Sequence, residues 1–143
     1  MTDRAVSVAV NYVLTLLIAT VLLGGLVVAA GGVIESQSNN SVHDELGVIG
    51  ERLAADVESA DRLRAAGGED ANVSVRSDLP NRVSGTSYSI EVDGEDGEIT
   101  LSSQRPEVTV TVSFTAEDVG STQVRGGAVV TVFEDDQLEV RET

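Results

Sequence analysis

The sequence contains no cysteine and no tryptophan, and it has only two prolines and one histidine. Without cysteine the chain forms no disulfide, carries no thiol nucleophile and has no thiolate to bind zinc or a lipid. The single histidine, His43, cannot form a histidine-based metal cluster, and no serine lies in a Ser-His-Asp context. We therefore expect no enzyme activity, no metal site and no cofactor.

Basic side chains are also scarce. All nine are arginine, because the chain has no lysine, and they face 24 acidic residues, which gives a formal net charge of −15. Binding to nucleic acid requires clustered Lys and Arg side chains that neutralise phosphates. We therefore expect no nucleic-acid partner. The 41% of hydrophobic residues argues against the disorder that strong acidity can otherwise indicate.

One long segment lacks charge altogether. Residues 5–34 contain no charged side chain, and as a helix they would span roughly 45 Å, more than the ~30 Å hydrocarbon core of a bilayer. A chain this small has too little protein to surround a helix that is apolar on every side. We expect a single transmembrane helix over residues 6–34. Arg4 on the short leading side favours a cytoplasmic N-terminus and an extracellular C-terminal domain.

A cleavable secretory signal is the alternative interpretation of this segment. The residues Val28-Ala29-Ala30 offer a site for signal peptidase, but the apolar run is about twice the usual length of a signal sequence. Cleavage there would release the acidic domain from the membrane.

The residues directly before the apolar run are Asp3-Arg4-Ala5-Val6-Ser7. This start resembles that of haloarchaeal type IV prepilins, in which a dedicated prepilin peptidase cuts after a basic and a small residue. The resemblance implies a leader over residues 1–5 that ends with Arg4 and Ala5, and a mature chain that starts at Val6. The acidic, lysine-free composition likewise resembles that of proteins from salt-loving archaea.

The resemblance implies a pilin-like structural subunit in the cell membrane or in a surface filament. Its partners would be membrane lipid, the prepilin peptidase and other pilin-like subunits. The chain departs from major pilins because it lacks their Ser-Pro and glycine-containing run after the cut, and it also lacks the glutamate of bacterial pilins. These departures favour a minor or divergent pilin. The alternative function is a membrane-tethered extracellular binding module that does not polymerise.

Several polar and small residues interrupt the apolar helix. Asn11 and Thr15 lie one turn apart, and an amide in hydrocarbon is costly unless it is paired. Asn11 would therefore bond to a neighbouring helix, or it would lie close enough to the lipid headgroups to be hydrated. Gly24, Gly25 and Ala29 would allow close approach of a second helix, or would loosen the helix where it leaves the membrane.

The next segments predict a linker and a second helix. Residues 35–40 are polar and are expected to form a linker, and Ser41 with Asp44 resembles a capping pair that starts a helix. The helix is expected over residues 41–66, with Gly67-Gly68 as its end. Its apolar residues recur every three or four positions, as expected for a helix with one face on a sheet: Leu46, Ile49, Leu53, Val57, Ala60 and Leu63.

Alternation of apolar and polar residues dominates the expected extracellular domain, residues 71–143. Runs of this kind occupy residues 72–76, 88–92, 98–102, 108–114, 128–133 and 138–141. The turn signals at residues 93–97 and 134–136 are short enough for hairpins. We expect an α+β fold with an antiparallel sheet of five to six strands, or a small sandwich as the alternative.

Two N-glycosylation sequons lie outside the apolar segment. They are Asn39-Asn40-Ser41 and Asn72-Val73-Ser74, so Asn39 and Asn72 are candidate glycan acceptors on an exported chain.

Overall fold

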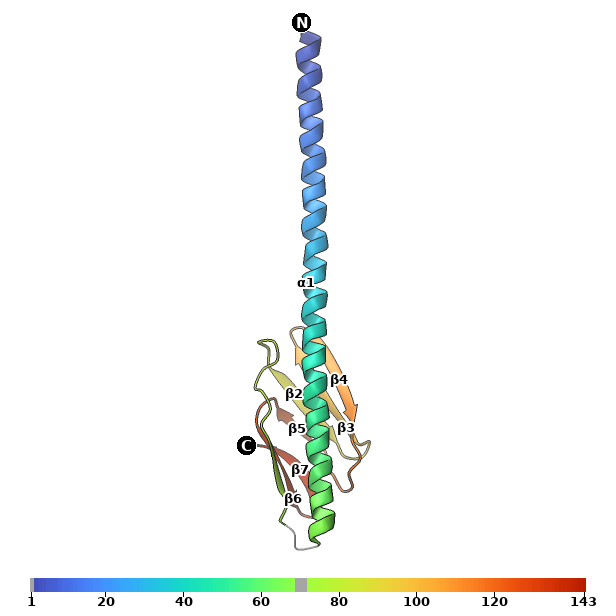
Figure 1. Cartoon of the computed structure of the whole chain (residues 1–143), viewed down its shortest axis with the longest axis vertical. Coiled ribbons are helices and arrows are strands. Elements are labelled where there is room, and N and C mark those ends of the chain that lie inside the picture. The colour runs from blue at the N-terminus through green and yellow to red at the C-terminus, as the bar shows by residue number, and fades with distance from the viewer. Residues whose placement is uncertain (1, 69–71) are drawn as a thin grey trace. The chain divides into compact units, whose positions relative to one another are not determined.

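The computed structural model describes residues 2–68 and 72–143 and divides the chain into two units, Met1–Gln37 and Ser38–Thr143. One helix, α1, covers Thr2–Gly67, and seven strands follow it (Figure 1). The predicted α+β class is confirmed. Ala71, the first residue of the predicted β domain, lies outside the described residues.

The seven strands are all paired antiparallel within two sheets. The larger sheet has the order β4-β3-β2-β5 and the smaller sheet the order β1-β6-β7. The strands are β1 (Ser74–Ser77), β2 (Tyr88–Asp93), β3 (Glu98–Gln104), β4 (Glu107–Ser113), β5 (Thr122–Arg125), β6 (Val129–Glu134) and β7 (Gln137–Glu142).

The prediction of five to six strands was wrong by one, because β5 was missed. This strand has four residues with a single apolar side chain, Val124, so its sequence shows almost no alternation. It exists because β2 offers a pairing edge, where Ile90 stands opposite Val124. A short strand of this kind depends on its neighbour in the sheet and not on its own propensity.

The two sheets adjoin at β5 and β7. Leu138 at the start of β7 bonds with the segment that leads into β5, through Leu138 N to Asp118 O at 2.7 Å and Gly120 N to Leu138 O at 2.9 Å. At the other end of these strands, the Arg125 amide donates to the Glu142 carboxylate at 2.9 Å. The sheets therefore form two connected walls around one core.

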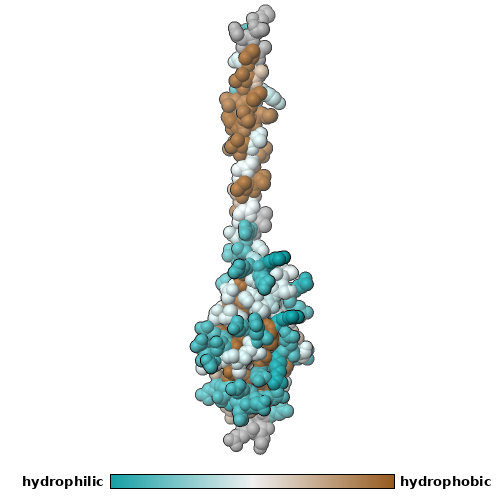
Figure 2. Space-filling model, turned by 180° about the vertical axis from the view of Figure 1, so that it is seen from behind, coloured by the Kyte–Doolittle hydropathy of each residue, from teal (hydrophilic) through white to brown (hydrophobic). Residues whose placement is uncertain are grey.

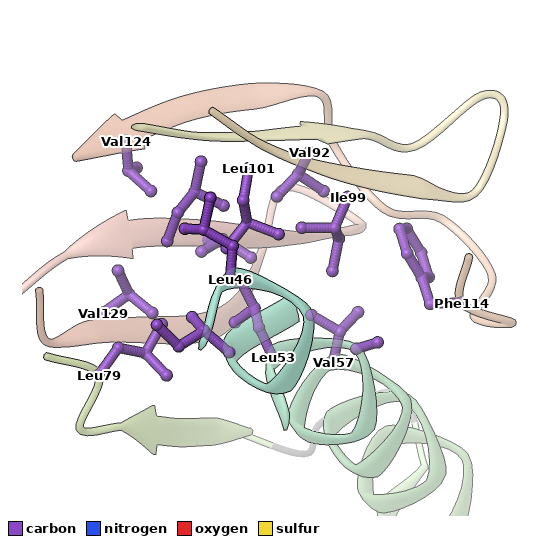
Figure 3. Packing of buried hydrophobic residues seen from close by; sticks show 14 of the residues in the cluster. Leu46, Leu53, Val57, Leu79, Val92, Ile99, Leu101, Phe114, Val124 and Val129 are labelled. Carbon is purple, nitrogen blue, oxygen red and sulfur yellow. The ribbon is translucent and has the colours of Figure 1, made fainter. Parts of the chain in front are cut away.

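The C-terminal part of α1 fills the space between these walls. Leu46, Leu53 and Val57 point toward Ile99 and Leu101 of the larger sheet (Figure 3), and all five side chains are fully buried. Burial of each such side chain stabilises the fold by about 1.5–3 kcal/mol. The predicted stripe is confirmed at its first five positions, and Val42 and Ala54 of α1 join the core.

Leu63 does not belong to this stripe and is 53% exposed. At about 100° per residue, Arg64 comes next in line with Leu53 and Val57, and Leu63 lies well to one side. The Arg64 guanidinium stacks on the Phe133 ring at 5.3 Å and pairs with Asp61 and Asp118, each at 3.2 Å. Arg64, whose long side chain is cationic at its end, therefore occupies the last position of the helix face that packs on the sheets.

The prediction that residues 35–40 form a linker that interrupts the helix was also wrong. This segment is helical, and Ser41 lies inside α1, where it cannot act as an N-terminal cap. Ser, Gln and Asn cost a helix only about 0.5 kcal/mol each, and the segment contains neither Gly nor Pro. The boundary between the two units, after Gln37, nevertheless falls within it. As predicted, the helix ends at Gly67, and Gly68 takes a left-handed conformation with φ of 76°.

The backbone of α1 comes close to the larger sheet at Gly50. A Cβ atom built there would lie 2.8 Å from both Leu101 Cδ1 and Val112 Cγ2. Valine is stiff at χ1 and cannot rotate away easily. Gly47, one turn earlier in the same helix, has no atom within 4 Å of its Cβ position.

This difference predicts opposite effects of two identical substitutions. We expect Gly50→Ala to lower the free energy of unfolding by about 1 kcal/mol, because overpacking outweighs the gain in helix propensity. Gly47→Ala should raise it by about 0.5–1 kcal/mol. Urea denaturation of the full chain in detergent, followed by circular dichroism, measures both. Equal effects of the two substitutions would contradict the described packing.

Candidate functional site: the apolar helix

The first unit consists of helix that no other part of the described chain covers. Its large apolar side chains from Val6 to Val33 are between 53% and 78% exposed. In the view of Figure 2, hydrophobic patches separated by paler ones follow one another along much of the first unit, whereas hydrophilic residues cover much of the second unit. This one helix is long and apolar enough to cross a membrane.

The predicted processing residues lie at the start of α1. Arg4 is exposed and Val6 is 61% exposed, so both side chains are accessible. The side chain of Ala5 lies outside what the structure describes. The bond before Val6 lies in helical backbone, directly ahead of the apolar run.

The residues predicted to pack helices together lie on more than one face. Asn11, Thr15, Gly25 and Ala29 lie within about 40° of one direction around the helix axis, whereas Gly24 points roughly the opposite way. The Thr15 hydroxyl donates to the Asn11 carbonyl at 2.8 Å, so it is satisfied within its own helix. The Asn11 side chain is exposed on the surface of the helix. The Asn11 amide is therefore the polar group on this face that is available to hydrogen-bond with a neighbouring helix.

The glycines in this unit have no function in packing within the chain. Nothing lies within 4 Å of the Cβ positions of Gly24, Gly25, Gly31 and Gly32. Glycine inside a helix costs about 0.5–1 kcal/mol relative to alanine. Four such residues therefore weaken the helix without an intramolecular contact that needs them.

The two sequons differ in backbone conformation and in how far their asparagine side chains are exposed. Asn72 is exposed and lies in irregular chain just before β1, which is the setting that N-glycan acceptors usually have. Asn39 is half-buried within α1, and the hydroxyl of its sequon, on Ser41, lies 3.4 Å from the Ser84 hydroxyl. The structure thus distinguishes two sites that the sequence treats as equal.

The second unit contains polar hollows on its surface. One of them, of about 480 Å³, lies beside Tyr88, with Arg105 and Arg125 among its lining residues. Burial raises the pKa of Tyr88 to about 12, and its neutral phenol donates to the Pro80 carbonyl at 2.7 Å. Tyr88 is therefore fixed in the wall of this hollow.

The remaining chemical candidates from the sequence have local explanations. His43 is exposed on α1, with Asp44 3.8 Å away. The Asp93 carboxylate accepts from the amides of Glu95 and Asp96 at 2.9 and 3.2 Å, which fixes the predicted hairpin turn between β2 and β3. Among residues 2–68 and 72–143, no group of three or more potential ligands could hold a metal ion.

The difference between the sequons predicts glycosylation at one site. In the native host we expect Asn72→Gln to remove a glycan mass from the mature chain and Asn39→Gln to leave the mass of the glycoform unchanged. Intact-mass spectrometry of both variants beside the parent chain measures this. A glycan on Asn39 alone would show that the helix around residue 39 forms only after modification.

The comparisons with known proteins place the chain in a family. No curated protein and no solved structure matches it. Residues 1–142 match a family of unknown function, DUF7266. The match covers the apolar helix and the β-rich unit together, so the chain belongs to the DUF7266 family.

Proposed function

We propose that this chain is a pilin-like structural subunit of an archaeal type IV pilus or a related surface assembly. The observation that carries the proposal is the uncovered apolar helix, with exposed apolar side chains on every face from Val6 to Val33. In a membrane, lipid covers such a surface, and in an assembled filament other helices of the same kind cover it.

Further support comes from the residues around the start of the helix. A prepilin peptidase would cut after Arg4 and Ala5, so that the mature chain starts with Val6 and the apolar run. A cut there leaves the whole helix on the mature chain for assembly. Before assembly, the helix would anchor the chain in the cell membrane with the N-terminus in the cytoplasm and the β domain outside.

The four glycines and Asn11 fit the same proposal. No contact within the chain uses the missing side chains of Gly24, Gly25, Gly31 and Gly32. Small residues allow helix backbones to approach closely in a membrane, and an exposed amide can bond across the contact. In the proposed assembly the glycines therefore allow close contact between the helices of neighbouring subunits, and the exposed Asn11 amide bonds across that contact.

A tethered binding module is the second candidate function. The polar hollow beside Tyr88 favours it, because two arginines and several hydroxyl groups line a space of about 480 Å³. Such a module would keep its leader and would gain nothing from contacts between its helices. Processing and helix association therefore discriminate between the two functions.

The first prediction concerns maturation. In the native host we expect the chain purified from membranes to start at Val6 and the Arg4→Glu variant to keep its first five residues, because the peptidase requires a basic residue there. Arg4→Lys, which keeps the charge, should still be processed at Val6. Intact mass and N-terminal sequencing measure the cut. Normal maturation of Arg4→Glu would contradict the proposal.

The second prediction concerns the helix face that contains Asn11. We expect Asn11→Leu to weaken self-association of the full chain in bilayers by roughly threefold to twentyfold, since hydrogen bonds between membrane helices contribute about 0.6–1.7 kcal/mol. Thr20→Val is the matched control, because Thr20 lies on the opposite face and donates to the Leu16 carbonyl of its own helix at 2.8 Å. Energy transfer between labelled chains measures the association. Equal effects of both changes would favour the tethered module.

A further inference from the structure

One edge of the larger sheet has no partner strand in the described part of the chain. Among the described strands, β4 pairs with β3 alone, at the margin of the sheet (Figure 1). The Phe114 amide donates to the Gly97 carbonyl at 2.8 Å, and backbone groups alternate in direction along a strand. The backbone groups of the three β4 valines therefore point toward β3. Those of the residues between and after the valines point away from the sheet: Thr109, Thr111 and Ser113.

β4 lacks the features that usually prevent an exposed edge from pairing. Such edges carry charged side chains, proline or a bulge. From Val108 to Ser113 the strand has no charge, no proline and no glycine, although 23% of the whole chain is charged. Its seven residues pair with β3 without a bulge. By contrast, β1 at the margin of the smaller sheet has only four residues and carries Arg76. The edge of β4 is therefore open to a further strand.

The hydrophobic core is also incomplete beside this edge. The valines of β4, Val108, Val110 and Val112, pack against the core but are only half-buried. Ile99 and Leu101 of β3 are fully buried, with a strand on each side of them. A further strand with apolar side chains on the same face would cover the valines in the same way. The edge thus combines outward backbone groups with half-exposed apolar side chains.

The side chains around this edge favour a second copy of the chain as the partner. Two copies of net charge −15 repel each other wherever their acidic side chains meet. The outer face of β4 and the adjoining part of β3 carry hydroxyl groups in their middle: Thr109, Thr111, Thr100 and Ser102. The hydroxyls of Thr100 and Thr111 lie 3.2 Å apart. Along this strip two copies can meet without bringing acidic side chains together.

The sequence of β4 is complementary to itself in one antiparallel register. The register is centred on Val110, which faces Val110 of the second copy. It pairs like residues on both faces of the sheet: Val108 with Val112, and Thr109 with Thr111. Outward backbone groups of one copy then meet outward groups of the other, whereas a shift by one residue would oppose them to groups already bonded to β3. The register uses the whole strand and places Glu107 opposite Ser113.

Pairing of this kind fixes the relative direction of the two copies. β4 runs in the same direction as α1, because Val112 lies beside Gly50 and the amide of Thr115, just after the strand, donates to Glu58 at 3.0 Å. In an antiparallel pair the helices of the second units therefore run in opposite directions. Ser38, where the second unit begins, then lies at opposite ends of the pair in the two copies. This arrangement suits copies in two facing membranes and not neighbours in one membrane.

We propose that β4 is a self-adhesive edge, which pairs antiparallel with β4 of a copy anchored in a facing membrane. The contact joins the two four-stranded sheets into one and covers the valines of both copies. It uses the same surface on each copy, so it closes a pair. Its function is to hold together two surfaces that carry this chain. The inference rests on the membrane anchoring in the proposed function, but not on processing at Arg4 or on filament formation.

The absence of cysteine makes this register directly testable. Full-length Thr109→Cys and Thr111→Cys chains are reconstituted into separate phosphatidylcholine vesicles, and the two populations are mixed and oxidised in high salt, which screens the net charge. Residues 109 and 111 of paired copies face each other at a Cα distance of about 5.5 Å, within the range of a disulfide. Two copies of one variant hold their thiol-bearing residues about 7–8 Å apart, beyond that range. We expect disulfide dimers in the mixture to exceed those in either population alone by on the order of tenfold.

Two further variants serve as controls. Thr100→Cys lies on the same face, one strand further from the edge, and should form no disulfide with Thr111→Cys. Thr111→Pro, introduced into the Thr109→Cys chain, should abolish the disulfide with Thr111→Cys. It should leave the circular dichroism of the chain unchanged, because proline removes an amide that points away from the sheet.

Any of three results overturns the proposal. They are equal yields in the mixed and separate populations, no disulfide in the mixture, and an undiminished yield when both variants share one dilute vesicle population. The chains in this experiment keep their first five residues. Failure to form the disulfide therefore concerns β4, whereas the start of the mature chain in the native host tests the proposed function.

Discussion

The packing of one helical face between two sheets is the constraint on which the second unit depends. The buried positions of α1 from Val42 to Ala60 belong to one hydrophobic core together with buried residues of both sheets. Backbone bonds connect the sheets where Leu138 of β7 pairs with the segment before β5, and the Arg125 amide donates to Glu142 at the other end of these strands. The helix backbone lies so close to the larger sheet at Gly50 that an added Cβ atom would lie 2.8 Å from Leu101 Cδ1 and Val112 Cγ2.

The same helix faces two different environments along its length. In the first unit every face is apolar, and in the second unit one face is apolar and the others are charged. A helix that is apolar on all sides requires lipid or other apolar helices, whereas a one-sided helix requires a sheet. A single element thus connects a part that is long and apolar enough to cross a membrane with a part that packs around its own core. The proposed function uses this division, with the first unit as anchor and assembly helix and the second unit outside the membrane.

The distribution of charge in the second unit follows from the antiparallel hairpins. Each hairpin places its turn at one end of the domain, and the turns at residues 93–97 and 134–136 are both acidic. The loop at residues 79–87 and the turn at Arg105 lie at the other end and carry arginine. In the linear sequence these charges alternate without an evident pattern. The order of the strands gathers the acidic turns at one end of the domain, whereas the end that carries the arginines also exposes Asp44 and Glu45.

The sequence by itself determined those features that depend on local pattern. Uninterrupted apolar character indicated the membrane-spanning length, spacing of three and four indicated the buried face from Leu46 to Ala60, and alternation indicated six of the seven strands. Tertiary structure decided the features that depend on partners distant in sequence. Pairing with β2 created β5, and the position of Phe133 and Asp118 placed Arg64 where Leu63 was expected. In both cases weak local preferences yield to contacts that only the folded chain provides. The predicted linker at residues 35–40 is helical for a local reason, because the segment contains no Gly or Pro to interrupt α1.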